Sequence, residues 1–255
     1  VLVPQLLKAL TAAARQGQPL PDTLRFVAVG GARVAPALLA DARSCGIPAY
    51  EGYGLSECAS VTTLNTPAAD CMGSVGKPLP HVKLRVMYDG EIQVAGSRML
   101  GYAGQPAQAK TWHATGDLGF IDSDGYLHLT GRRKNLFVTA YGRNVNPEWP
   151  ESELTRHAQI AHAVVFGEAR NHNTAVILPL MPQVQDGDIA GLIDAANETL
   201  PDYARIHNWV HADGPFTPDN GMLTPSGKPR RDQVWAHYQA AIDALAAKPD
   251  IQETA

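Results

Sequence analysis

The sequence predicts a fold of mixed class, with an α/β domain over residues 1–131 followed by an α+β domain over residues 132–255. Three observations predict it. A strand–helix–strand pattern over residues 25–50 is typical of a parallel βαβ unit. Alternating apolar and polar residues then flank an Asp-Gly turn, which indicates a small antiparallel β subdomain within the first domain. Finally, the composition changes after Gly131, where we place the domain boundary.

The composition is that of an ordinary globular protein. The 255 residues are 45% hydrophobic and 18% charged, and the formal net charge of −4 gives no electrostatic footprint for nucleic acid. We see neither a transmembrane segment nor a signal peptide, so we expect a cytoplasmic enzyme. Cys45, Cys58 and Cys71 form no CxxC pair and have no histidine cluster beside them in the sequence, which argues against a metal site.

The first domain opens with the βαβ unit. Its predicted segments are a helix over 3–14, a strand over 25–29, a helix over 35–45 and a strand over 47–50. Gly30 and Gly31 follow the first strand as a tight turn. Because ligands bind parallel sheets at the carboxyl ends of the strands, this turn and the segment after Tyr50 are candidate site positions.

That segment is Glu51-Gly52-Tyr53-Gly54-Leu55-Ser56-Glu57. Tyr53 offers a face that can stack on a purine, Ser56 a hydroxyl for a phosphate, and Glu57 a carboxylate for Mg²⁺. The alternative is structural, with Ser56 capping a helix whose first turn carries Glu57. The residues alone leave both interpretations open.

Residues 77–102 show a β pattern with a hairpin turn at Asp89-Gly90. The segment Thr115-Gly116-Asp117-Leu118-Gly119 follows, and an acid between glycines at a strand end can accept the two hydroxyls of a ribose diol. An aspartate that only shapes a turn is the alternative. A second hairpin turn at residues 122–125 precedes a strand over 126–130.

The sequence of the second domain predicts a small sheet with helices. Its predicted segments are strands over 136–139, 163–166, 174–180 and 206–211, and helices over 146–157 and 189–200. Trp235, Tyr238, Ile242 and Leu245 have the spacing of a last amphipathic helix, which we expect to pack on the sheet.

Before that helix runs the loop Thr224-Pro225-Ser226-Gly227-Lys228-Pro229, followed by Arg230 and Arg231 at the helix start. Proline and glycine hold the loop out of regular structure. Lys228 carries a compact charge on a long stem, which suits it to reach a phosphate or a carboxylate. A solvated lysine on a turn is the plain alternative.

Five motifs in this order resemble those of the ANL superfamily of adenylating enzymes, which includes acyl-CoA synthetases, peptide-synthetase adenylation domains and luciferases. They are YGLSE at 53–57, DGEIQVAG with Gly101-Tyr102, TGDLG at 115–119, GRRKN at 131–135 with the YGR and PE that follow, and PSGKPRR at 225–231. The motif phrasing after Gly131 is most similar to the long-chain fatty-acyl branch. The resemblance covers essentially the whole chain and implies a partial large adenylating domain followed by a mobile C-terminal domain.

The resemblance implies a nucleotide site for ATP and AMP in the first domain. Tyr53 would stack on adenine, while Asp117 would bind the ribose hydroxyls with the help of Arg132. Ser56 would contact the α-phosphate and Glu57 would hold Mg²⁺. The other cofactor-binding positions implied are Gly30, Gly31, Ala32, Glu51 and Gly52.

In the second domain the resemblance implies residues that act in turn. Lys228 would bridge the acyl carboxylate and the phosphate during adenylation, where lysine and Mg²⁺ offset the charge that builds up at phosphorus. Rotation at the hinge residue Lys134 would then withdraw this loop and bring in a thiol-transfer face. There Gly142 would border the pantetheine channel of CoA, and Arg143 would approach phosphate.

The sequence departs from the family pattern in one respect, the phosphate loop. The family has a Ser/Thr/Gly-rich phosphate loop that ends in lysine well before the tyrosine motif, and residues 1–52 contain none. We therefore expect the chain to be the C-terminal part of an acyl-CoA synthetase that activates a fatty acid, and to be inactive alone. Core edges of the parallel sheet would then be exposed.

Two alternatives stay open. The acyl group could pass to a carrier protein rather than to CoA. The chain could also be a non-catalytic module that binds a nucleotide or a partner. The joint presence of Glu57, Asp117 and Lys228 argues against the second alternative, because a binding module needs neither a magnesium ligand nor a mobile lysine.

Overall fold

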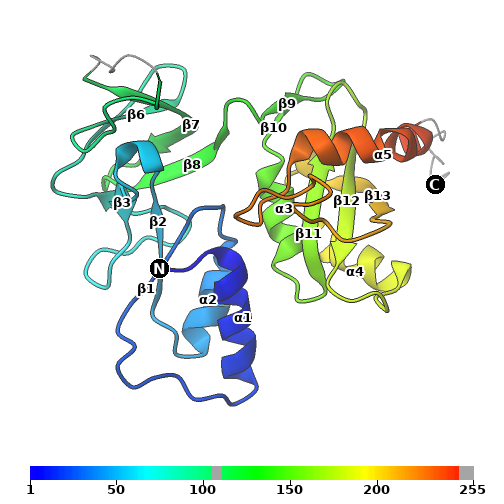
Figure 1. Cartoon of the computed structure of the whole chain (residues 1–255), viewed down its shortest axis with the longest axis horizontal. Coiled ribbons are helices and arrows are strands. Elements are labelled where there is room, and N and C mark those ends of the chain that lie inside the picture. The colour runs from blue at the N-terminus through cyan, green and yellow to red at the C-terminus, as the bar shows by residue number, and fades with distance from the viewer. Residues whose placement is uncertain (105–110, 247–255) are drawn as a thin grey trace. The chain divides into compact units, whose positions relative to one another are not determined.

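The computed structural model describes residues 1–104 and 111–246, and it divides into two compact units, Val1–Lys134 and Asn135–Ala255. The division lies three residues after the boundary we predict. The reason is that strand β8 (Leu127–Arg132) belongs to a sheet of the first unit and carries Arg132 with it. The two units are described separately below (Figure 1).

The first unit begins with the predicted βαβ arrangement, which is confirmed. Its elements are α1 (Pro4–Arg15), β1 (Val27–Val29), α2 (Pro36–Ser44) and β2 (Ala49–Tyr53). Strands β1 and β2 pair in parallel, with Val27 opposite Ala49. Leu7 of α1 and Leu39 of α2 are fully buried against the strands, so the apolar stripes of both helices form the core here.

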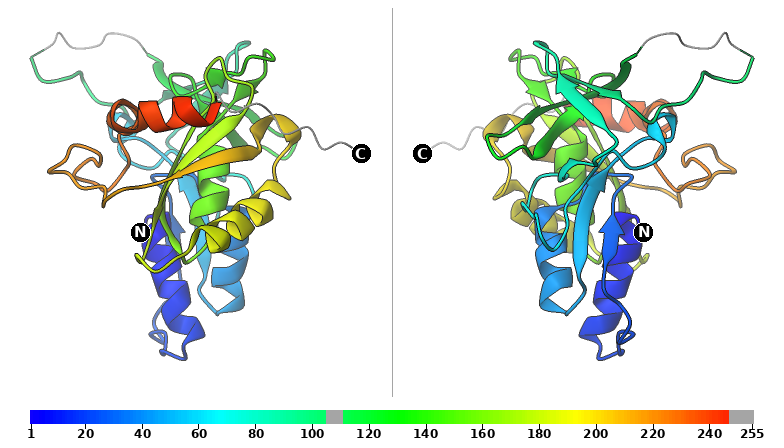
Figure 2. Two further views of the ribbon diagram at one scale, coloured as in Figure 1. Left: turned by 90° about the vertical axis from the view of Figure 1, so that its right-hand side faces the viewer. Right: turned by 90° about the vertical axis from the view of Figure 1, so that its left-hand side faces the viewer.

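Two short antiparallel strands, β3 (Thr63–Leu64) and β4 (Lys77–Pro78), extend this sheet to the order β1-β2-β3-β4. Figure 2 shows the long β2 arrow running beside β1, with the two helices flanking them. Strand β1 lies at the sheet edge, where Leu2 makes an isolated parallel bridge to Val29.

A second sheet of the first unit has the order β5-β6-β7-β8 and is antiparallel throughout. Its other strands are β5 (Lys83–Val86), β6 (Glu91–Ala95) and β7 (His113–Ile121). The predicted hairpin around Asp89-Gly90 joins β5 to β6. Asp117, however, lies inside the nine-residue β7 and not at a strand end. Gly116 has φ +72°, and the pairing register of β7 shifts near this motif with both of its neighbours, β6 and β8. The motif therefore forms a bulge within the strand.

The two sheets are joined by backbone hydrogen bonds. The amide of Val75 donates to the carbonyl of Leu127 at 2.8 Å, and the amide of Leu127 donates to the carbonyl of Gly76 at 3.0 Å. Apolar side chains from both sheets, among them Val75, Ile92 and Leu127, form a common core around Tyr53. The loop before β4 is therefore fixed against β8.

The second unit is a three-layer arrangement. Its central sheet has the order β11-β12-β13, formed by β11 (Ile160–Phe166), β12 (Asn173–Pro179) and β13 (Ile206–His211). Helices α3 (Glu148–Thr155) and α4 (Asp186–Asn197) bury Leu154 and Ile193 on one face of this sheet. Helix α5 (Arg231–Ala246) covers the other face, as Figure 2 shows. A hairpin of β9 (Phe137–Val138) and β10 (Asn144–Val145) precedes α3.

The predicted stripe of the last helix is confirmed in its main part. Tyr238 and Ile242 are buried against Val164, Phe166 and Val176 of the sheet. Trp235 packs partly buried at the same face, whereas Leu245 is half-buried and lies outside this cluster. The spacing of the apolar residues therefore identified the face on which α5 packs.

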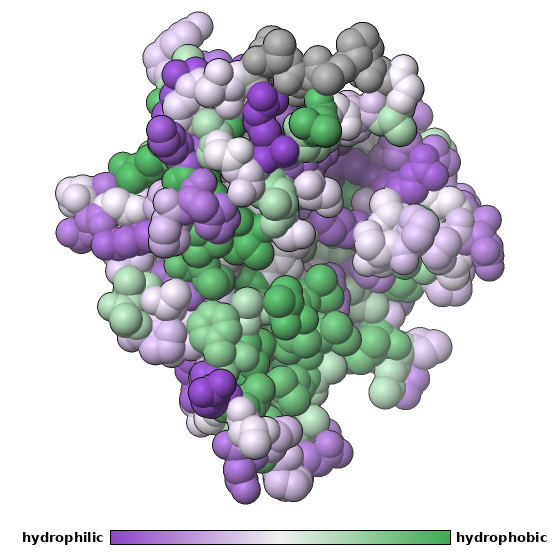
Figure 3. Space-filling view, turned by 60° about the vertical axis from the view of Figure 1, so that its left-hand side comes forward, coloured by the Kyte–Doolittle hydropathy of each residue, from purple (hydrophilic) through white to green (hydrophobic). Residues whose placement is uncertain are grey.

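Apolar side chains also reach the surface of the first unit. Val1, Val3, Leu6 and Phe26 are exposed at or near α1 and the edge strand β1. In Figure 3 apolar side chains gather in the lower half of the view. Within the described residues, every helix is too short or too polar to cross a membrane.

Candidate nucleotide site and lysine loop

Three residues with predicted nucleotide roles meet in the first unit. The hydroxyl of Tyr53 donates a 2.7 Å hydrogen bond to Oδ2 of Asp117, and Nε of Arg132 donates a 2.7 Å hydrogen bond to Oδ1. The three side chains come from β2, β7 and β8, and the β7–β8 register sets Asp117 directly opposite Arg132 (Figure 1). We call them the Tyr53–Asp117–Arg132 cluster.

The cluster is buried on one side and open on the other. Tyr53 is 9% exposed and Asp117 is 7% exposed, whereas the Arg132 side chain is 40% exposed. Burial raises the pKa of Tyr53 well above its usual range, and the nearby Asp117 charge acts in the same direction. The phenol is therefore protonated at neutral pH and acts as a hydrogen-bond donor to Asp117.

Asp117 keeps acceptor capacity despite these two bonds. A carboxylate has about four lone-pair sites, and Tyr53 and Arg132 each occupy one, on different oxygens. The backbone of Asp117 is also fixed, because its amide donates to Oγ1 of Thr115 at 3.0 Å. Thr115 in turn donates to the carbonyl of Ile92 at 2.8 Å. The carboxylate is thus held in place, and the two side-chain bonds use only part of its acceptor capacity.

Glu51, one of the implied cofactor-binding positions, is buried. It is 7% exposed and lies on the same buried face of β2 as Tyr53. Burial raises the pKa of Glu51 to about 8, although the charge of Arg33 and a hydrogen bond from the Val34 amide oppose this effect. Through Val34 the carboxyl group contacts the loop that follows β1.

That loop contains the other predicted pocket residues. Gly30 lies against β2 so closely that a Cβ at this position would be 2.5 Å from the carbonyl oxygen of Gly52. Gly31 has φ +81°, a left-handed conformation that favours glycine. Gly31 and Ala32 are exposed. The glycines therefore bring a solvent-facing turn next to β2. Three residues after the end of β2, Ser56 begins a new turn.

Ser56 and Glu57 lie in a three-residue 3₁₀ turn, Ser56–Cys58, and not in a helix capped by Ser56. Leu55, and not Ser56, is the N-cap residue of this turn, so the capping role that the structural alternative gives Ser56 is wrong. Ser56 is exposed and Glu57 half-buried. Oε1 of Glu57 accepts a 3.2 Å hydrogen bond from the hydroxyl of Tyr102, which raises the pKa of Tyr102. Glu57 thus presents a carboxylate that one tyrosine orients.

Lys228 lies in the second unit on a turn that ties its own backbone. The Thr224 amide donates to the Lys228 carbonyl at 2.8 Å, and the Lys228 amide donates to Oγ1 of Thr224 at 3.0 Å. Gly227 completes the turn with φ +79°. The Lys228 side chain is exposed, and in the described part of the chain no hydrogen bond or ion pair holds its ammonium group.

The two arginines after the loop behave differently. Arg231 donates from Nη1 to the carbonyl of Val165 at 2.6 Å and from Nη2 to Oε1 of Glu151 on α3. Arg230 is exposed, and its nearest carboxylate is Asp232 at 3.9 Å. Arg231 therefore fixes the start of α5 to β11 and α3. The loop of residues 224–229, which carries Lys228, directly precedes this fixed segment.

The remaining predicted positions are exposed. Lys134 is the last residue of the first unit, so the predicted hinge coincides with the division between the units. Gly142 and Arg143 lie in the turn between β9 and β10, where Gly142 has φ +72°. The Arg143 guanidinium lies 5.8 Å from the ring centre of Tyr203.

Sequence reasoning missed several of these supports. Thr115 fixes Asp117, Tyr102 orients Glu57, and Arg231 pairs with Glu151. Thr115 opens the TGDLG motif and Tyr102 ends the β-subdomain motif, so both could have been weighed. The Arg231–Glu151 pair joins residues far apart in the sequence, and no local pattern indicates it.

Two family models match the chain. The AMP-binding enzyme model matches residues 1–102, and the model of the AMP-binding enzyme C-terminal domain matches residues 134–250. The second match begins at the residue that ends the first structural unit.

Relatives and solved structures agree with these matches. The long-chain-fatty-acid–CoA ligase FadD15 of Mycobacterium bovis is 34% identical over 259 residues, which cover 90% of this chain and 43% of the relative. The long-chain-fatty-acid–[acyl-carrier-protein] ligase AEE15 of Arabidopsis thaliana is 30% identical over 241 residues, which cover 78% of this chain and 33% of the relative. The chain thus spans less than half the length of these relatives.

Among solved structures, o-succinylbenzoate CoA synthetase (MenE) of Bacillus subtilis in complex with the acyl-adenylate OSB-AMP is 27% identical. Its TM-score is 0.73, and the match covers 91% of this chain and 50% of that one. The same enzyme has been solved with ATP and a magnesium ion. The fold, the two model matches and these relatives show that the chain belongs to the ANL superfamily of adenylate-forming AMP-binding enzymes and represents part of such an enzyme.

Proposed function

We propose that the protein takes part in the ATP-dependent activation of a fatty acid as an acyl-adenylate and in its transfer to the thiol of CoA. The observation that carries the proposal is the Tyr53–Asp117–Arg132 cluster, in which a fixed carboxylate keeps two acceptor sites beside a buried aromatic ring. The 34% identity to a long-chain-fatty-acid–CoA ligase supports fatty acid as the acid.

In this proposal the first unit binds the nucleotide. The two free acceptor sites of Asp117 take the ribose hydroxyls, and the hydrogen bond from Arg132 orients the carboxylate. The Tyr53 ring lies along the adenine. The close approach of Gly30 to Gly52 lets the turn through Ala32 run beside the same strand as Tyr53. Glu51 holds that turn through the Val34 amide and acts as a positioning residue.

Glu57 fits a role in holding Mg²⁺. Protein-bound Mg²⁺ uses one or two carboxylates together with waters and phosphate oxygens, and a half-buried carboxylate oriented by Tyr102 provides one. The ion, when bound, neutralises phosphate charge. Ser56, one residue earlier and exposed, donates its hydroxyl to the α-phosphate.

Lys228 supplies the positive charge for the adenylation step. Acid activation brings a carboxylate to a phosphate, and a cation placed between these two anions stabilises the transition state most. The exposed ammonium of Lys228 has no competing partner in the described part of the second unit. Lys134 serves as the hinge between the half-reactions, with Gly142 and Arg143 on the face that receives CoA.

A carrier protein is the second candidate acceptor, because one relative is an acyl-carrier-protein ligase. The two acceptors are separated by one competition assay. A preformed acyl-adenylate is offered with CoA and an acyl carrier protein together, and the labelled product identifies the preferred thiol. If the carrier protein is labelled faster than CoA, the carrier protein is the proposed acceptor in place of CoA.

The test of the proposal is fatty-acid-dependent exchange of pyrophosphate into ATP. We propose that this chain alone is inactive and that the product of the whole reading frame is active, since the chain spans less than half of its relatives. Exchange only by the longer protein supports both statements. Exchange by the chain alone contradicts the proposed inactivity. If neither protein catalyses exchange with acids of different length and ring content, the result favours a nucleotide-binding or partner-binding module. Localisation in the cytoplasm also stays a prediction.

A further inference from the structure

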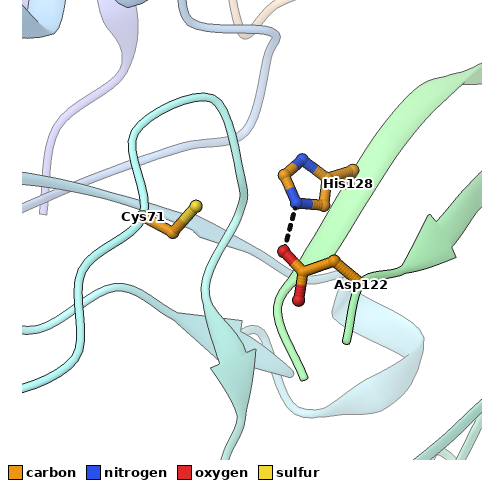
Figure 4. A group of neighbouring side chains, drawn as sticks. All are labelled: Cys71, Asp122 and His128. Carbon is orange, nitrogen blue, oxygen red and sulfur yellow. Dashed lines mark hydrogen bonds and ion pairs between the residues drawn. The ribbon is translucent and has the colours of Figure 1, made fainter. Parts of the chain in front are cut away.

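A second group of chemically reactive side chains lies in the first unit away from the proposed nucleotide residues. Cys71, Asp122 and His128 each point a ligand-type atom into the same space, and these three atoms lie within 4.8 Å of one another (Figure 4). Nε2 of His128 lies 2.8 Å from Oδ2 of Asp122, and the Cys71 thiol faces this pair. All three side chains are partly exposed.

The backbone holds the three segments together. Cys71 belongs to the loop between β3 and β4, whereas Asp122 and His128 belong to the β7–β8 hairpin. The paired hydrogen bonds of Val75 and Gly76 with Leu127 fix this loop beside the residue that precedes His128. The Cys71 thiol and the His128 imidazole therefore lie close together because these backbone hydrogen bonds join the two sheets.

The Cys71 loop has its own internal support. Oδ1 of the buried Asn65 accepts a 3.0 Å hydrogen bond from the Cys71 amide, and its Nδ2 donates to the Ser74 carbonyl at 2.8 Å. The Ser74 hydroxyl donates to the Cys71 carbonyl at 2.7 Å. The loop thus presents the thiol from a fixed backbone.

The hairpin side is equally ordered. Oδ1 of Asp122 accepts hydrogen bonds from the amides of Asp124 and Tyr126 at 3.0 and 2.8 Å, which leaves Oδ2 directed at His128. The His128 ring stacks on Phe120 with 4.8 Å between centroids and 8° between planes. Stacking and the tight turn fix the imidazole and the carboxylate in orientation.

We propose that Cys71, Asp122 and His128 form a binding site for Zn²⁺ or a similar divalent transition metal, with a fourth position open to water. A thiolate, an imidazole and a carboxylate are the three ligand types that Zn²⁺ uses. Mg²⁺ takes oxygen ligands and is disfavoured by this set. The site differs from the proposed magnesium position at Glu57 in both place and chemistry.

The geometry needs only side-chain adjustment to bind the metal. Tetrahedral Zn²⁺ with ordinary bond lengths separates its N, O and S ligands by about 3.4–3.6 Å. The distance between Nε2 of His128 and Oδ2 of Asp122 would increase slightly from 2.8 Å. The sulfur of Cys71, which lies within 4.8 Å of a ligand atom of each residue, would move closer to this pair. The neutral imidazole of His128 would bind through the Nε2 lone pair with its single proton on Nδ1, Asp122 would bind as a carboxylate, and the Cys71 thiol proton would pass to solvent.

A bound metal would tie the two sheets of the first unit together at a second point. The tie would not require ATP or an acid, because none of its ligands belongs to the proposed nucleotide site. The proposal can therefore be tested on the chain itself by metal binding, without an activity assay.

The experiment is a Co²⁺ titration of the reduced, chelator-treated and untagged chain, followed by absorbance. We expect one equivalent of Co²⁺ to give a thiolate-to-cobalt charge-transfer band that equimolar Zn²⁺ removes and excess Mg²⁺ does not. Cys71→Ser should abolish the band and weaken Co²⁺ binding at least about tenfold, the loss that even outer-sphere partners of a metal can cause. His128→Gln should weaken binding to a similar extent.

Cys45→Ser is the matched control, because Cys45 is also a free and partly exposed thiol of the first unit. It should leave the band unchanged, and the buried Cys58 is present in every variant. Circular dichroism establishes that each variant is folded. A wild-type chain without the band, a band that persists in Cys71→Ser, or a band lost in Cys45→Ser overturns the proposal.

Discussion

The Asp117 carboxylate and the Lys228 ammonium are the two charges on which the proposed adenylation depends, and the protein holds them in opposite ways. Asp117 is buried, with a hydrogen-bond partner on each oxygen and a third bond at its amide. Lys228 is exposed on a turn in which only the backbone is tied.

The difference follows from what each group has to do. A carboxylate that binds a ribose diol must be in one orientation before the nucleotide arrives, since ordering it on binding would cost affinity. A cation that serves one half-reaction and then withdraws must not be held by the protein itself. We infer that the first unit supplies a preorganised pocket and the second unit supplies a mobile charge.

Lys228→Ala tests the mobile side of this comparison and has the largest expected effect. In the product of the whole reading frame it should slow pyrophosphate exchange by about 10²–10³-fold, as removal of one transition-state charge partner does. Thiol transfer from a supplied acyl-adenylate should be spared. Lys83→Ala, at another exposed lysine, is the control. Equal loss of both half-reactions would refute the role assigned to Lys228.

Glu51→Gln tests the buried side through pH. Because the pKa of Glu51 is raised to about 8, the folded state holds this proton more tightly than the unfolded state. The resulting stabilisation is fully present below about pH 4.5 and is lost as pH rises to about 8. The free energy of unfolding should fall by at most about 1.4 kcal/mol per pH unit across this window from this group.

Urea unfolding between pH 5 and about 8 measures this slope, and Glu51→Gln should reduce it. Glu198→Gln, at an exposed position of the second unit, is the matched substitution. A Glu51→Gln slope equal to that of the wild type would show that Glu51 does not carry a raised pKa in the folded chain.

Asp117→Ala should damage both the pocket and its fold. It leaves the buried Tyr53 hydroxyl without its acceptor, which costs about 1–3 kcal/mol of unfolding free energy. ATP affinity of the full-length protein should fall as well, and isothermal titration measures it. Asp117→Asn, which retains an acceptor oxygen, should lose less stability. An unchanged ATP affinity in Asp117→Ala would argue against the ribose assignment.

Tyr53→Phe has the smallest expected effect and separates two functions of one side chain. It removes the bond to Asp117 and keeps the ring, so we expect a loss of about 0.5–1.5 kcal/mol in stability with nearly unchanged ATP affinity. Tyr53→Ala should lower both quantities. If Tyr53→Phe alone abolishes ATP binding, the hydroxyl and not the ring is the essential part.

Local pattern was enough for most elements of this chain. The βαβ unit, the hairpin at Asp89-Gly90 and the packing face of α5 follow from apolar spacing and turn residues. One prediction was wrong in detail, because Asp117 lies within a bulged strand, and the alternative in which Ser56 caps a helix was wrong because Ser56 begins a 3₁₀ turn. The bulge at Asp117 depends on pairing with the distant strands β6 and β8, which local spacing does not indicate.

By itself, the sequence determined the order of the motifs and thereby the family and the list of candidate residues. Only the tertiary structure decided which of them meet. Strand pairing sets Asp117 opposite Arg132 and under the Tyr53 hydroxyl, and the contact between the sheets brings Cys71 to His128. The physical reason is that side-chain hydrogen bonds and metal geometry act over a few ångströms, and register between distant segments is fixed only when the whole core packs.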